Sequence, residues 1–81
     1  MAKTFHLSVA RVAETLFEGD AVSLPAPGEG GVLTVLAGHE ALVTPLKEGV
    51  LRFTAGSGEV TELSIPRGIL EVSDNQATVL L

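Results

Sequence analysis

Apolar and polar residues alternate in short runs along most of the chain, and glycine or proline separates these runs. Strict alternation occurs in segments 5–9, 21–24, 60–65 and 76–80. A period of two residues between turn-forming residues is typical of a strand that buries one face. Between Gly19 and Gly68, no interval free of glycine and proline reaches the length of an ordinary helix, about 11 residues. The sequence therefore predicts an all-β fold, a β-sandwich of about eight to ten short strands.

Residues 9–17 contain no glycine or proline and allow two interpretations. A helix would gather its apolar residues into one stripe, Val12, Ala13, Leu16 and Phe17. Periodicity does not decide between helix and strand over so few residues. We favour a strand, because Val9 closes an alternating run and Glu18-Gly19-Asp20 is typical of the next turn.

Four segments carry turn or chain-break signals. Residues 55–59 and 73–75 are predicted to be hairpin loops, the first with glycine to supply positive φ. Residues 25–31, which are rich in proline and glycine, are predicted to form an exposed loop. Because proline donates no backbone hydrogen bond, Pro66 should end a strand at Ile65 or place it at a sheet edge.

Composition narrows the range of functions. Ten acidic against five basic residues give a net charge of −5, and there is no Trp or Tyr, so nucleic acid is a poor candidate partner. The absence of cysteine excludes disulfides and thiolate chemistry. No apolar run approaches the roughly 18 residues of a membrane span, and the start resembles no signal peptide. We therefore expect one cytoplasmic domain, residues 1–81.

Three arrangements that could carry chemistry are each incomplete. The Gly28–Gly31 run lacks the Lys-Ser/Thr of a phosphate-binding loop and precedes a predicted strand instead of a helix. His39 has only His6 as a second imidazole for a metal site. Ser23, His39 and Asp20 could be combined into a triad, but no nucleophile-elbow sequence surrounds any serine. We predict no catalytic, cofactor-binding or metal-binding residue.

Lys47 raises the alternative of a carrier domain. A small all-β domain with a lysine on an exposed hairpin resembles the lipoyl and biotinyl carriers. Those domains expect a hydrophobic residue, often Met, on each side of the modified lysine. Leu46 fits this pattern, whereas Glu48-Gly49 does not.

Five sequence blocks occur in the order and at the spacing of one family. They are Phe-His-Leu at 5–7, Leu-Phe-Glu-Gly at 16–19, Ala-Gly-His at 37–39, Leu-Val-Thr-Pro-Leu-Lys-Glu-Gly at 42–49 and Gly-Ile-Leu-Glu-Val at 68–72. In these blocks the chain resembles the N-terminal β-sandwich domain of the epsilon subunit of the F-type ATP synthase, over essentially its whole length.

The resemblance implies a flattened β-sandwich on the central stalk, bound to the gamma subunit and resting on the ring of c subunits. It implies a non-catalytic rotor subunit that couples proton-driven rotation to ATP synthesis and needs no cofactor. It also implies a peripheral position at the cytoplasmic face of the bacterial plasma membrane. A standalone β-sandwich interaction module is the alternative function.

Contact residues follow from the same resemblance. The Glu29-Gly30-Gly31-Val32 loop and the Gly38-His39-Glu40 turn are expected together at one end of the sandwich, facing the c-ring. Val43 and Leu46 are the expected contacts with gamma, on a strand face.

Epsilon subunits usually continue into a pair of C-terminal helices that can act as an inhibitory arm. The sequence stops at Leu81, where the last strand is expected to end. We therefore expect this chain not to supply such an arm.

Overall fold

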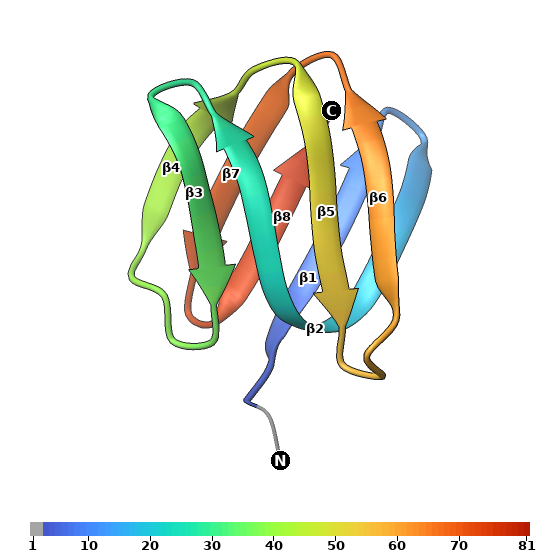
Figure 1. Ribbon diagram of the computed structural model, residues 1–81, viewed down its shortest axis with the longest axis vertical. Coiled ribbons are helices and arrows are strands. Elements are labelled where there is room, and N and C mark those ends of the chain that lie inside the picture. Colours follow the sequence, from blue (N-terminus) through green and yellow to red (C-terminus); the bar gives the residue numbers. More distant parts are fainter. Residues whose placement is uncertain (1–2) are drawn as a thin grey trace.

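The alternating segments form eight β-strands arranged in two packed layers (Figure 1). The structure is a computed structural model that describes residues 3–81, so the first two residues of the expected domain lie outside the described part. The strands are β1 (Phe5–Arg11), β2 (Glu14–Gly28), β3 (Gly31–Leu36), β4 (Leu42–Leu46), β5 (Gly49–Ala55), β6 (Val60–Ile65), β7 (Gly68–Ser73) and β8 (Gln76–Leu80). The predicted all-β sandwich is confirmed, and its extents of 33 × 24 × 20 Å show that it is flattened.

The long strand β2 belongs to both layers. Its first half pairs with β1, and the back layer in Figure 1 continues through β8 and β7 to β4. Its second half pairs with β3 and β5, and β6 completes the front layer. β1 and β8 run parallel, whereas the other pairs are antiparallel. The two layers are therefore joined by one continuous strand as well as by loops.

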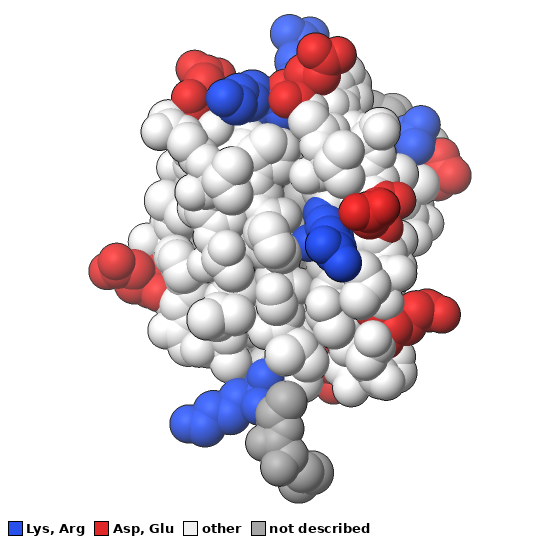
Figure 2. Space-filling model, viewed as in Figure 1, with Lys and Arg blue, Asp and Glu red and all other residues white. Residues whose placement is uncertain are grey.

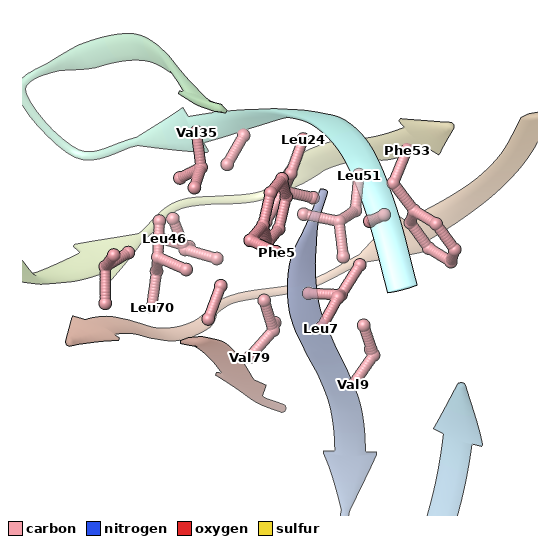
Figure 3. Close-up of a cluster of buried hydrophobic side chains, with 14 of the residues drawn as sticks. Phe5, Leu7, Val9, Leu24, Val35, Leu46, Leu51, Phe53, Leu70 and Val79 are labelled. Atoms are coloured by element: carbon pink, nitrogen blue, oxygen red, sulfur yellow. The ribbon is translucent and has the colours of Figure 1, made fainter. Parts of the chain in front are cut away.

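Inward-facing residues of both layers form the core (Figure 3). Alternation along β1 turns Phe5, Leu7 and Val9 inward, and all three are buried. The buried residues of the described chain are all apolar, with no buried polar or charged side chain. Each large side chain that leaves water in this way contributes about 1.5–3 kcal/mol. The two-residue period therefore accounts for the core as well as for the strands.

Residues 9–17 form strand rather than helix, as favoured, but with a turn that the sequence did not signal. β1 ends at Arg11, and Ala13 adopts a left-handed conformation with φ of 61° before β2 begins. The turn predicted at Glu18-Gly19-Asp20 is wrong, because these residues lie inside β2 and pair with β1. Strand pairing on both sides of the hairpin overrides the local turn preference of Gly19.

The exposed loop predicted at 25–31 is also wrong, because β2 continues through Pro25, Ala26 and Pro27 to Gly28. Pro25 and Pro27 donate no backbone hydrogen bond, but this interrupts pairing only on the side of β2 that faces β5, not on the side that faces β3. The ladder between β2 and β5 is limited to residues 21–23 of β2, while the pairing with β3 continues to the end. Only Glu29-Gly30 remains as the turn.

The remaining turn predictions are confirmed. Residues 56–59 join β5 to β6, with Gly58 at a φ of 95°, and Asp74-Asn75 join β7 to β8. β6 ends at Ile65, directly before Pro66. The described residues contain no helix long and apolar enough to cross a membrane.

Candidate functional site

The two segments expected to face one partner lie at opposite ends of the sandwich. The Glu29-Gly30 turn precedes β3, and the Gly38-His39-Glu40 turn follows it. The six residues of β3 span roughly 20 Å at about 3.3 Å per residue. The prediction that both segments meet at one end is therefore wrong: a turn and the next loop along the chain are separated by the strand between them.

We call the first of these ends the Gly30 end. Four connections meet there, at 12–13, 29–30, 47–48 and 66–67, as the top of Figure 1 shows. Two backbone hydrogen bonds fix the hairpin tip, because Glu29 N–H donates to Pro45 O at 3.0 Å and Lys47 N–H donates to Pro27 O at 2.9 Å. The tip itself is exposed from Glu29 to Val32.

The glycines of the tip have different roles. A Cβ on Gly28 would lie 2.6 Å from Gly31 O, so no side chain fits there. Gly31 has a φ of 135°, which disfavours any other residue although the space around it is open. Gly30 has neither constraint, since nothing lies within 4 Å of the position that a Cβ would take and its φ is not in the left-handed region. A new side chain at Gly30 would therefore contact no other part of this chain, and it would interfere only with a partner bound at the tip.

A hollow of about 710 Å³ opens at the Gly30 end, between the β4–β5 connection, the β6–β7 connection and the end of β8. Ile69, Leu80 and Leu81 contribute apolar side chains to its lining. Its charged residues carry both signs, Lys47 and Arg67 against Glu29 and Glu48. Lys47 lies on a connection between strands of different layers and not on a hairpin, so the geometry expected of a carrier lysine is not present.

We call the other end the Asn75 end, because one side chain ties its loops together. Gly38 N–H donates to Asn75 Oδ1 at 2.9 Å, and Asn75 Nδ2 donates to Thr4 O at 3.0 Å. His6 N–H donates to Asn75 O at 3.1 Å. Asn75 therefore holds the Gly38 turn against the N-terminal segment. The sequence pattern predicts a turn at Asn75 but does not indicate this network.

His39 lies beside this network, with its Nδ1 2.7 Å from Glu40 O. Gly38 has a φ of 81°, so glycine serves the turn itself, and open space surrounds it. Among residues 3–81 no group of three His, Cys, Asp or Glu side chains is arranged to hold a metal ion.

Of the two residues expected to contact gamma, only Val43 is on the surface. Val43 is 67% exposed on the outer side of the back layer, whereas Leu46 is 2% exposed and belongs to the core. Leu46 as a surface contact is therefore wrong, because residues three apart on a strand face opposite sides.

A row of apolar residues crosses the outer side of the back layer near the Gly30 end. The strand register places Pro45, Ile69, Leu80 and Ala10 next to one another on β4, β7, β8 and β1. Ile69 is 44% and Leu80 51% exposed. The local sequence pattern does not indicate this row, since only the pairing of strands far apart in sequence brings it together.

The outer side of the front layer is almost free of charge (Figure 2). Its exposed apolar residues include Val32, Leu36 and Val50. Its charged residues are Arg52 and Glu62, which pair with each other at 3.7 Å. In Figure 2 most other charged groups gather at the ends and margins of this face. Val32 closes the segment expected at the c-ring and, as the strand predicted after Gly31 requires, is part of β3.

Comparison with solved structures shows the same fold in two ATP synthases. A chain of the Euglena gracilis mitochondrial ATP synthase, from the OSCP/F1/c-ring structure in rotational state 1, superposes with a TM-score of 0.88 at 24% identity over 95% of this chain. A chain of the Tetrahymena thermophila mitochondrial ATP synthase central stalk and c-ring superposes with a TM-score of 0.79 at 16% identity over 98% of this chain. The chain spans 49% and 63% of the length of these two relatives.

The sequence comparison agrees with the fold. The family described as the ATP synthase delta/epsilon chain, beta-sandwich domain, matches residues 4–81, which include all eight strands. The chain therefore belongs to the family of ATP synthase delta/epsilon chain β-sandwich domains.

Proposed function

We propose that this chain is a non-catalytic rotor subunit of the central stalk of an F-type ATP synthase. In this role it couples rotation of the c-ring, driven by proton transport, to ATP synthesis through the gamma subunit. The observation that carries the proposal is the family match over residues 4–81. The chains that share its fold come from structures of an F1/c-ring assembly and of a central stalk with c-ring.

For the c-ring contact we propose the Gly30 end alone, with Glu29, Gly30, Gly31 and Val32. These residues are exposed, and a hairpin tip can approach another surface without disturbing the core. The Gly38-His39-Glu40 turn, at the Asn75 end, cannot face the same ring, since β3 separates the two ends. Of the two segments expected at the ring, only the first is therefore retained.

For the gamma contact we propose the outer side of the back layer, with Val43 retained and Ile69 and Leu80 in place of Leu46. All three are exposed apolar residues on one face. Such a surface suits a large protein partner. Each Å² of apolar surface removed from water contributes roughly 25 cal/mol, so a partner that covers more of this face binds more tightly.

As part of the same proposal, the chain lies peripherally at the cytoplasmic face of the bacterial plasma membrane, held there by the complex. Affinity purification with the tagged chain from membranes of its source organism tests function and location together. We expect the gamma and c subunits in the eluate in the presence of mild detergent. Recovery of neither, with the tagged chain folded, would contradict the proposal and favour a standalone interaction module.

A further inference from the structure

β3 is an edge strand with one open side. It pairs with β2, and no other strand within residues 3–81 pairs with it. The two-residue turn places Gly28 opposite Gly31, so the backbone groups of Leu33 and Val35 are directed at β2. The N–H and C=O groups of Val32 and Thr34 are directed away from β2, toward the open side.

β3 differs from the other edge strands of the described chain in having no protection. Natural edge strands avoid unwanted pairing through charged side chains, proline or bulges. β4 contains Pro45 and is also paired with β2 where Leu46 lies opposite Gly28. β6 contains Glu62, and the first half of β2 contains acidic residues and a bulge opposite Val9 and Ala10. β3 reads Gly-Val-Leu-Thr-Val-Leu, with no charge, no proline and no register shift.

The side chains of β3 extend this open edge onto the uncharged outer side of the front layer. Val32 is 77% and Leu36 53% exposed, and Thr34 between them is exposed as well. A short strand of high β-propensity without charge is the sequence type that pairs readily with another strand. The backbone and the side chains of β3 thus favour the same kind of partner, an uncharged extended strand.

We propose that β3 is a self-association site, at which two copies of the chain pair antiparallel about Thr34. In this register each Val32 lies opposite Leu36 of the partner copy and each Leu33 lies opposite Val35. Outward residues meet outward residues and inward residues meet inward ones, as an antiparallel pair requires. The two Thr34 residues meet at the two-fold axis, and β3 of neither copy brings a charge to the contact.

The pairing joins two four-stranded front layers into one continuous sheet. Its contact, two strands of six residues, is smaller than the roughly 1,200 Å² of a stable interface. We therefore expect weak, transient association.

Self-association through β3 does not depend on the proposed function. If both are correct, the two contacts compete for the same residue. Val32 takes part in the proposed c-ring contact and in the β3 pair. A chain paired through β3 therefore cannot dock on the ring, so self-association would belong to the unassembled subunit.

Sedimentation velocity of the purified chain from about 10 µM to 1 mM tests the inference without any other subunit. We expect the weight-average mass to rise with concentration from 8.4 kDa toward twice that value. Thr34→Glu places two like charges at the two-fold axis and should weaken association at least tenfold. Thr34→Lys should do the same, and an equimolar mixture of the two variants should associate again.

Ser64→Glu is the matched control, because it adds the same charge at an exposed position of the other edge strand of this layer. It should associate as the unchanged chain does. Hydrogen exchange should show concentration-dependent protection at the amides of Val32 and Thr34. A chain that stays monomeric at 1 mM would overturn the inference. So would a dimer that is equally sensitive to Thr34→Glu and Ser64→Glu, or variants that do not associate when mixed.

Discussion

The glycines at the Gly30 end do not all serve the same purpose: some are needed by the turn itself, and another is free to contact a partner. Gly28 and Gly31 are required by space and by φ, whereas Gly30 is restricted by neither. Gly30→Trp should therefore leave the unfolding midpoint within about 2 °C of the original value. If the tip faces the c-ring, the same variant should reduce proton pumping in reconstituted vesicles severalfold.

Ser57→Trp provides the control for Gly30→Trp, because Ser57 is exposed in the β5–β6 turn at the opposite end of the molecule. It should pump normally. Normal pumping by Gly30→Trp would show that the tip does not approach the ring.

Asn75 is the residue on which the opposite end depends. Its φ of 60° suits Asn and Gly, and its side chain makes two hydrogen bonds. Asn75→Ala should lose both bonds and add backbone strain, for a total of about 2 kcal/mol in the free energy of unfolding. Asn75→Gly removes the bonds without the strain and should lose about 1 kcal/mol less. Urea denaturation measures both, and equal losses would contradict the account of φ.

At the scale of elements, alternation of apolar and polar residues predicts strands well, because a strand that buries one face needs an apolar residue at every second position. The segments 5–9, 60–65 and 76–80 are all strands, and most of their apolar residues face inward. Val60 and Leu80, near the ends of their strands, are exposed instead. The segment 25–28 does not follow its composition. Proline lacks an N–H group, but this breaks the ladder only if its nitrogen is directed at a paired neighbouring strand, which then lacks a donor. Sequence alone does not reveal which side that is.

The candidate surfaces are less predictable than the strands, for a related reason. Leu46, expected on a surface, lies in the core, while the row of Ile69 and Leu80 is not visible in the sequence pattern. A surface depends on which distant strands lie side by side, and local patterns do not record this. The separation of Glu29 from His39 by β3 is a second case, because the length of one strand decides it.

The back layer carries the element-scale prediction. Ile69→Glu places a charge in the apolar row next to Pro45 and Leu80 and should weaken gamma binding at least tenfold, or about 1.4 kcal/mol. Val50→Glu, at a similarly exposed position of the front layer, is the control and should bind normally. Isothermal titration calorimetry with purified gamma measures both. The opposite order of affinities would assign gamma to the front layer.

At the scale of the whole molecule, the sandwich offers different surfaces in different directions. On the face that Figure 2 shows, most charged residues lie at the ends and margins, and the front layer itself is nearly uncharged. The back layer carries an apolar row. The proposed rotor subunit would need separate contacts of this kind for the c-ring and for gamma. The flattened shape, with its shortest extent of 20 Å, gives two broad faces and two ends.

The most direct test of the central claim is ATP-driven proton pumping in vesicles that contain an ATP synthase stripped of its own epsilon subunit. Addition of this chain should restore pumping to at least half of the level obtained with the native subunit, at a stoichiometry of about one chain per complex. Coupling requires simultaneous contact with gamma and the ring. Binding without restored pumping would therefore contradict the rotor assignment. The absence of binding to the stripped complex would contradict it as well.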